Sequence, residues 1–171
     1  MKFKVDKAFF VKDMSMDVID AKPAVYRCWF DVIPEKVIQG GVDVSLIQTR
    51  TINGINLYAL YVGKAANAQK RLRNHLPYSS HQTFRTSTLR RTLRALLCNP
   101  SQSDEECANV VNQFMTDHAY LEWGYYSSNE EAKNCESGYI TSGYYPLNNS
   151  ENILSLKPWT HQLTQLRNRW K

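Results

Sequence analysis

The segment spanning residues 53–76 restricts the fold more than any other part of the chain, because a turn, a strand and a helix follow one another in it. Its opening Asn-Gly pair is a turn signal, and the β-branched and aromatic residues that follow up to Val62 favour a strand. Gly63 permits a tight turn at the end of that strand, and residues 66–76 have a helical pattern. We therefore expect a strand that leads directly into a helix.

Other segments of the chain have strand or helix patterns of their own. Strands are predicted at 23–33 and 120–126, and helices at 87–97, from Ser103 onward, at 129–142 and at 159–170. Residues 40–50 have a weaker pattern that fits either an inserted strand or a loop. Ser103 and Glu106 have the spacing of a capping box. The mixed order predicts an α+β fold in which helices cover a small sheet.

The chain has 171 residues, which is a typical length for one domain, so we expect a single domain over 1–171. Its four cysteines lack metal-type spacing, which indicates reduced thiols in a cytoplasmic protein. The first ten residues are too charged for a signal peptide, and no apolar run reaches the roughly 18 residues of a membrane span. We therefore expect no contact with a membrane.

Charge is distributed unevenly along the sequence. No acidic residue lies between Asp43 and Asp104, and the interval 44–103 contains nine of the 21 lysines and arginines. The remaining residues therefore carry 21 − 9 = 12 cations against 16 acids. A long block of positive charge without acids is typical of a surface that binds a phosphate backbone. A basic, solvated surface without a partner is the alternative.

The helix predicted at 87–97 carries several of these cations, and Ser87 or Thr86 could serve as its N-cap. Leu89, Leu93 and Leu96 form one apolar stripe, and the arginines of the helix lie outside it. We expect contacts with a nucleic-acid backbone from the basic residues in and before this helix: Lys70, Arg73, Arg85, Arg90, Arg91 and Arg94.

Polar side chains gather where the strand ending at Val62 meets its helix. Arg71 and His75 are four positions apart, so they share one helix face. Tyr61 and Lys64 lie at the end of the strand, where they could join that pair. A guanidinium suits a phosphate because its fork binds two oxygens at once. A solvated helix face beside a packed tyrosine is the alternative.

A carboxylate in the helix at 129–142 is a candidate metal ligand. Glu136 lies beside an apolar stripe formed by Ala132, Cys135 and Tyr139, so we expect it to be partly shielded. A carboxylate in that position could hold Mg²⁺, which prefers oxygen ligands and keeps several waters. An ordinary surface glutamate is the alternative.

Seven positions of the sequence together resemble the signature of the GIY-YIG nuclease superfamily. The residues are Tyr26 in "AVYR", Tyr61 and Gly63 in "YVGK", Arg71 and His75 in the next helix, Glu136, and Asn148 in "YPLN". The segment "STLRRTLRALL" also resembles a bacterial branch of that superfamily. The resemblance extends over about 23–149.

The resemblance implies a three-stranded antiparallel sheet flanked by helices, and a metal-dependent endonuclease that hydrolyses DNA. It implies that Glu136 holds Mg²⁺ or Mn²⁺, that Arg71 steadies the scissile phosphate, and that Tyr61 or Tyr26 acts as the general base or its hydrogen-bond partner. Asn148 would support the site, with His75 and Lys64 as secondary members. Cations near a tyrosine would favour its phenolate.

Two segments lie outside the expected pattern. The first and second tyrosines are 35 positions apart, which predicts an insertion at about 34–52 that loops out between them. If it does not loop out, Tyr58 replaces Tyr26 as the partner of Tyr61. A helical extension is expected at about 153–171, and a homodimer or a partner protein could supply sequence specificity.

Two other kinds of function remain open from the sequence. A nucleic-acid-binding protein without catalytic activity would have the same scaffold and the same basic residues. A protein-interaction module would use the basic surface to bind an acidic partner. Cleavage of DNA would distinguish a nuclease from both of these. Retention of DNA at low salt would distinguish the nucleic-acid-binding protein from the protein-interaction module.

Overall fold

The computed structural model describes residues 7–10, 15–76, 84–149 and 152–170. Its strands are β1 (Lys7–Phe10), β2 (Ala24–Phe30), β3 (Thr49–Ile52), β4 (Ile55–Ala65) and β5 (Ala119–Tyr125). Its α-helices are α1 (Glu35–Gln39), α2 (Ala68–His75), α3 (Thr88–Leu97), α4 (Asp104–His118), α5 (Asn129–Ser142) and α6 (Lys157–Asn168). Short 3-10 turns are found at Met16–Val18, Val44–Leu46 and Leu154–Leu156.

The strands form one antiparallel sheet in the order β1-β5-β2-β4-β3. The expected α+β class is thus confirmed, with three central strands and one further strand at each edge. β1 and α1 were not predicted, and β3 includes only the last two residues of the segment 40–50, whose pattern fitted either a strand or a loop. No helix among the described residues is long and apolar enough to cross a membrane.

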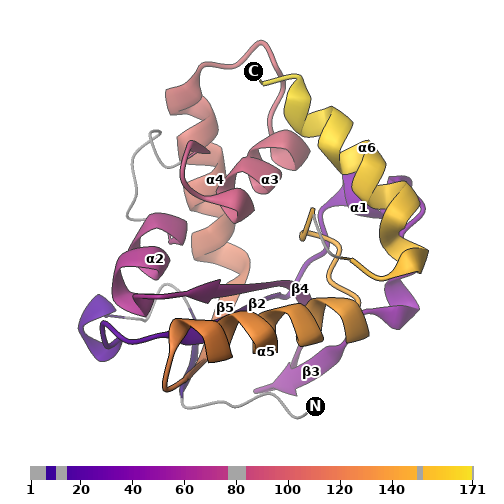
Figure 1. Cartoon of the computed structure of the whole chain (residues 1–171). Coiled ribbons are helices and arrows are strands. Elements are labelled where there is room, and N and C mark those ends of the chain that lie inside the picture. Colours follow the sequence, from indigo (N-terminus) through magenta and orange to yellow (C-terminus); the bar gives the residue numbers. More distant parts are fainter. Residues whose placement is uncertain (1–6, 11–14, 77–83, 150–151, 171) are drawn as a thin grey trace.

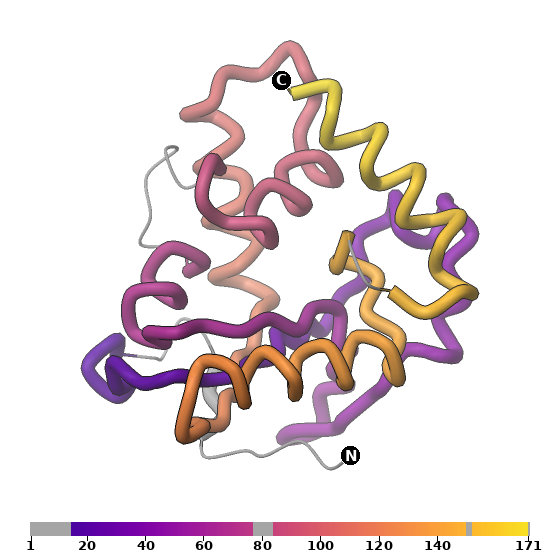
Figure 2. The backbone as a smooth tube through the Cα atoms, in the orientation of Figure 1, coloured from indigo at the N-terminus to yellow at the C-terminus, as the bar shows by residue number. Residues whose placement is uncertain are grey.

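Helices cover both faces of the sheet (Figure 1). One face, here called the α2 face, packs against α2, α3 and α4, and the other, the α5 face, packs against α5. β2 is buried on both sides because Tyr26 points to the α2 face and Val25 to the α5 face. α6 packs against α3 beside the sheet, as the backbone trace in Figure 2 shows.

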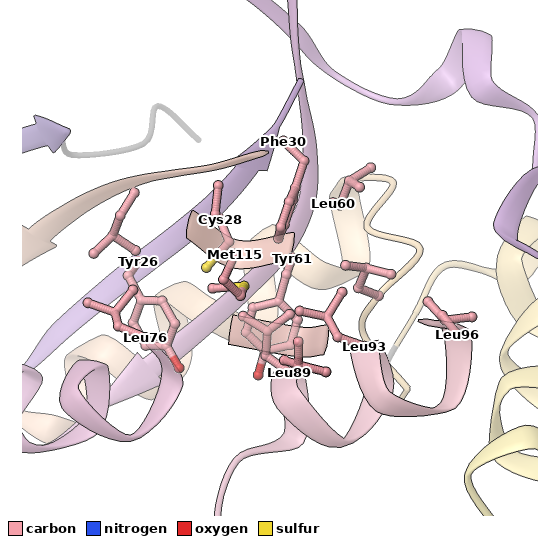
Figure 3. Close-up of a cluster of buried hydrophobic side chains, with 14 of the residues drawn as sticks. Tyr26, Cys28, Phe30, Leu60, Tyr61, Leu76, Leu89, Leu93, Leu96 and Met115 are labelled. Carbon is pink, nitrogen blue, oxygen red and sulfur yellow. The ribbon is translucent and has the colours of Figure 1, made fainter. Parts of the chain in front are cut away.

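A β-bulge in β4 determines which face the second motif tyrosine occupies. Cys28 pairs with Tyr61 and Trp29 pairs with Ala59, so Leu60 has no partner in β2. The extra residue interrupts the alternation of side chains, and Leu60 and Tyr61 both pack on the α2 face. Figure 3 shows the side chains of Tyr26 and Tyr61 within the same buried cluster. Strict alternation from Ala59, which packs on the α5 face, would instead have placed Tyr61 on the α5 face.

The 24 positions between β2 and β4 form α1, a 3-10 turn and β3, which pairs with the first part of β4. Asn53 and Gly54 both have positive φ, of 50° and 80°, as the two-residue hairpin turn between β3 and β4 requires. Tyr58 pairs with Phe30 at the far end of β2, whereas Tyr26 pairs with Gly63. The neighbour of Tyr61 is therefore Tyr26 and not Tyr58.

The helix boundaries agree closely with the sequence patterns. α5 has the predicted bounds, and α3 begins one residue after its N-cap Ser87. Both hydrogen bonds of the capping box between Ser103 and Glu106 are present at the start of α4. The predicted end of β4 was wrong, because the strand continues through Gly63 to Ala65.

Candidate active site

A chain of buried polar side chains joins β2, α2 and the start of α3. The hydroxyl of Tyr26 lies 2.5 Å from Nε2 of His75, and Nδ1 of His75 lies 2.5 Å from Oγ of Ser87. A neutral imidazole donates from one nitrogen and accepts at the other. If Tyr26 donates to His75, then His75 must donate to Ser87, and the opposite direction reverses both bonds.

Ser87 was predicted only as a possible helix cap. It does cap α3, because its hydroxyl oxygen accepts a hydrogen bond from the backbone N–H of Arg90. The same oxygen also contacts His75, which is 12 positions earlier in the chain. Nothing in the local sequence distinguishes a cap that also holds an imidazole from an ordinary one, so this contact could not be predicted.

Burial keeps the side chains of His75 and Tyr26 uncharged. Burial and then the nearby Arg71 and Arg90 lower the pKa of His75 well below its usual value. Burial raises the pKa of Tyr26 well above its usual value, and Arg71 offsets only part of that rise. The pKa of Tyr61 is also raised, with burial as the main cause. Arg71 acts on both tyrosines in the expected direction, but burial outweighs it, so both phenols are neutral in the free protein.

Gly63 is needed for close packing within the strand, not for the tight turn expected there. A Cβ atom at this position would lie 2.6 Å from the hydroxyl oxygen of Tyr26 and 3.0 Å from the ring of Tyr61. The ring centroids of the two tyrosines are 6.3 Å apart. Absence of a side chain at Gly63 thus makes room for the phenol of Tyr26 on the α2 face.

Arg71 links the buried tyrosines to the surface. Its guanidinium is half-buried and donates a hydrogen bond of 2.8 Å to the backbone carbonyl of Thr86. Burial disfavours its charge, but Tyr26, Tyr61 and Glu136 together raise its pKa above the usual value. Arg71 therefore stays charged while it remains within reach of solvent.

Glu136 comes from the helix on the other face of the sheet. α5 packs against β2 and β4 from the α5 face, and Glu136 is half-buried. The Glu136 carboxylate nevertheless interacts electrostatically with Arg71 and Tyr61. Charged and polar residues from the two faces of the sheet, Glu136 on one side and Arg71 and Tyr61 on the other, therefore interact across it.

Asn148 lies along the edge of β4 that β3 leaves unpaired. Its side chain accepts a hydrogen bond from the Val62 N–H at 3.0 Å and donates one to the Val62 carbonyl at 2.8 Å. The neighbouring Leu147 N–H donates to the carbonyl of Leu60. This segment thereby satisfies backbone groups that would otherwise be unpaired at a buried strand edge.

Lys64 does not join Arg71 and His75. It lies within β4, where it pairs with Val25, and paired residues of a sheet share a face. Val25 belongs to the α5 face, so Lys64 lies on that face too. The expectation that Lys64 joins Arg71 and His75 is wrong, because β4 continues past Lys64 and directs it to the other face of the sheet.

The basic residues predicted to contact nucleic acid separate into two groups. Lys70, Arg73 and Arg85 are exposed, and Arg91 is half-buried. Arg90 has no exposed surface and donates hydrogen bonds to the Leu76 carbonyl and to Asn112. Arg94 is buried between the rings of Phe84 and Trp170 and forms an ion pair with Asp104.

The predictions for Arg90 and Arg94 as backbone contacts are therefore wrong. The leucine stripe correctly identified one buried side of α3. However, α4 and α6 also pack against this helix, so a second side of it is buried as well.

The donor set at the site fits a hard cation held by few protein ligands. Among the described residues, no group of three or more His, Cys, Asp or Glu side chains is arranged to hold a metal ion. Glu136 is a single carboxylate that interacts electrostatically with the phenol of Tyr61 and the guanidinium of Arg71. Mg²⁺ is often bound through one or two carboxylates, with waters and substrate phosphates as its other ligands, so one glutamate is compatible with such an ion.

Comparison with known protein families gives a match over most of the chain. The family model described as the GIY-YIG catalytic domain matches residues 24–169, a range that begins with β2 and includes α6. No curated protein and no solved structure matches the chain. The matched range contains all of the site residues described above, from Tyr26 to Asn148.

Proposed function

Because this chain belongs to the GIY-YIG family of catalytic domains, we propose that it is a nuclease that hydrolyses DNA phosphodiester bonds with a divalent metal ion. The observation that carries this proposal is the electrostatic coupling of Glu136 with Arg71 and Tyr61. A carboxylate for a cation and a guanidinium for a phosphate are the two charged groups that this reaction requires.

Arg71 and Glu136 have different roles in the proposed reaction. Arg71 binds the scissile phosphate and stabilises the negative charge that grows on its oxygens in the transition state. Glu136 holds Mg²⁺ or Mn²⁺, and such an ion supplies Lewis-acid stabilisation and an acidified water. Both side chains are half-buried, so substrate can reach them.

The tyrosines act as neutral phenols in this proposal. Tyr61 is 4% exposed and uses its hydroxyl to orient water or a phosphate oxygen beside Arg71. Tyr26 is completely buried, so it and His75 position Tyr61 and Arg71 rather than contact DNA. Neutral phenols donate hydrogen bonds to a phosphate, whereas phenolates would repel it.

The exposed basic residues Lys70, Arg73 and Arg85 supply a surface for the DNA backbone in this proposal. Each of them is expected to contribute about one unit to the salt dependence of binding. Lys70 and Arg73 lie in α2, which also carries Arg71, and Arg85 lies just before α3, which Ser87 caps.

The test is cleavage of supercoiled plasmid by the purified chain. Mg²⁺ or Mn²⁺ should permit nicking, EDTA should abolish it, and Glu136→Gln should remove it while leaving the folded protein intact. Arg71→Gln should lower the rate by about 100-fold or more, as loss of a charge-stabilising donor does in other enzymes. Glu130→Gln, an exposed carboxylate in the first turn of α5, is the matched control and should cleave normally.

Two outcomes would contradict the proposal. Binding of DNA without cleavage under every divalent metal would favour the non-catalytic nucleic-acid-binding protein. Cleavage that persists unchanged in Glu136→Gln would show that the activity does not come from this site.

A further inference from the structure

Two arginines outside the site described above lie together between α3 and α6. Arg91 extends from the first turns of α3, and Arg167 from the last turn of α6. The Nε atoms of both, and Nη1 of Arg167, are buried without a hydrogen-bond partner. Both side chains as a whole are only half-buried, so their remaining atoms reach solvent.

The other buried arginines of the protein have partners. Arg27 pairs with Glu122, Arg94 pairs with Asp104, and Arg90 donates to Asn112, although the Nε atoms of Arg90 and Arg94 also lack a partner. In the described parts of the chain, no carboxylate pairs with Arg91 or Arg167. Shielded guanidinium groups without a counter-charge are costly in the free protein.

α3 packs against α6, and Arg167 interacts electrostatically with Arg91 and with Tyr61. Burial, and then the positive charge of Arg91, lower the pKa of Arg167, while Tyr61 acts in the opposite direction. α3 has no acidic residue in its first turn, so the positive end of its dipole is uncompensated near Arg91. All these features favour an anion beside Arg91 and Arg167.

We propose that Arg91 and Arg167 form a second phosphate site, which holds a phosphate of the DNA strand next to the one bound by Arg71. This inference rests on the proposed function, because Tyr61 connects the two sites. A phosphate offers oxygens to both guanidinium forks at once, and partial burial of the forks strengthens each contact. The pair would thereby fix the position of the strand relative to Tyr61.

The experiment measures binding of the full chain to a short DNA duplex in EDTA, so that no cleavage occurs. Each phosphate near the centre of one strand is replaced in turn by a neutral methylphosphonate. For the wild type, neutralising one particular phosphate should weaken binding about 10-fold, as expected for loss of a contact worth about 1.4 kcal/mol. In Arg91→Gln and Arg167→Gln, DNA binding should be weaker than in the wild type. Replacing that particular phosphate by a methylphosphonate should then have no further effect on binding.

Arg169→Gln is the matched control, because Arg169 is exposed at the end of the same helix. It should keep the wild-type response to every neutralised phosphate. If Arg91→Gln and Arg167→Gln also keep that response, or if the chain binds no DNA, the proposed second site is wrong.

A measurement of stability separates binding from a structural role. Arg167→Met removes a shielded, unpartnered charge, so it should raise the melting temperature of the free protein while weakening DNA binding. A fall in the melting temperature with unchanged DNA affinity would instead identify Arg167 as a purely structural residue and overturn the proposal.

The second site and the nuclease activity can fail separately. If the methylphosphonate response depends on Arg91 and Arg167 but no metal supports cleavage, the phosphate site stands and the nuclease proposal fails. If the chain cleaves plasmid normally but both variants respond to methylphosphonates as the wild type does, the nuclease stands and the second site fails.

Discussion

The hydroxyl of Tyr26 lies 2.5 Å from Nε2 of His75, although the two residues are 49 positions apart. This buried contact joins β2 to α2. It also engages the hydroxyl of the first motif tyrosine with a buried imidazole. Arg71 interacts electrostatically with both phenols, and Tyr61 is the less buried of the two.

The neutral state of His75 predicts how stability depends on pH. The folded protein holds the His75 pKa well below its usual value, whereas the unfolded chain takes up this proton as pH falls through about 6.5. Stability from this residue is therefore present above that pH and lost below it, with a slope of up to about 1.4 kcal/mol per pH unit. His75→Gln should be less stable near pH 7.5 and should lack this part of the slope.

Urea unfolding between pH 5 and pH 8 measures the effect. His161→Gln is the control for loss of a histidine, because His161 is exposed on α6. An equally steep slope in His75→Gln and in the wild type would contradict the assignment.

The raised pKa of Tyr61 predicts the shape of the pH profile for cleavage. A phenol whose pKa lies far above neutrality stays protonated between pH 6 and pH 9. Tyr61→Phe should lower kcat but leave the shape of the profile unchanged over that range. If the wild type instead gains activity with a midpoint that Tyr61→Phe lacks, then Tyr61 ionises during catalysis.

Gly63→Ala should destabilise the protein by about 1–3 kcal/mol, because the new methyl group would overlap the phenol of Tyr26. A double-mutant cycle with Tyr26→Leu checks the cause, since this second change removes the ring. The cost of Gly63→Ala should then largely disappear. A cost that is the same in both backgrounds would mean that the glycine is needed for its backbone and not for this contact.

Asn148→Ala should leave the N–H and the carbonyl of Val62 without partners in a buried position. We expect a loss of about 1–3 kcal/mol in the free energy of unfolding, together with faster exchange of the Val62 amide hydrogen. Asn149→Ala, the half-buried neighbour in the sequence, is the control. Unchanged exchange at Val62 in Asn148→Ala would show that the side chain does not protect this strand edge.

Arg90 and Arg85 should respond to substitution in opposite ways. Arg90→Ala removes a completely buried side chain with two hydrogen bonds and should cost about 2–5 kcal/mol of stability without altering the salt dependence of DNA binding. Arg85→Ala should leave stability unchanged and reduce the salt slope by about one unit. Binding titrations at several salt concentrations and urea unfolding of both variants separate the two effects.

Much of the secondary structure follows from local signals in the sequence. Ser103 and Glu106 predict the start of α4 because a capping box satisfies its partners within one turn. The Asn53-Gly54 turn is equally local, since both of its positive φ angles suit these residues. The helix at 129–142 is also defined by its own cap and stripe.

The features that could not be predicted depend on distant partners. Gly63 looks like the end of a strand until Tyr26 is placed opposite it. The bulge at Leu60 has no local signal either, yet it decides the face on which Tyr61 lies. Arg50 belongs to the acid-free block of the sequence but pairs in space with Glu122, so one-dimensional charge patterns overstate how much positive charge is free.

The long separations within the site have a consequence for biosynthesis. Tyr26 and Asn148 are 122 positions apart in the chain, and Glu136 lies on a helix that follows the last strand. Contacts between such distant residues close large loops, which slows folding. A nascent polypeptide on the ribosome therefore has no assembled site until α5 and the asparagine after it have left the exit tunnel, and fragments released earlier lack the Glu136 carboxylate altogether.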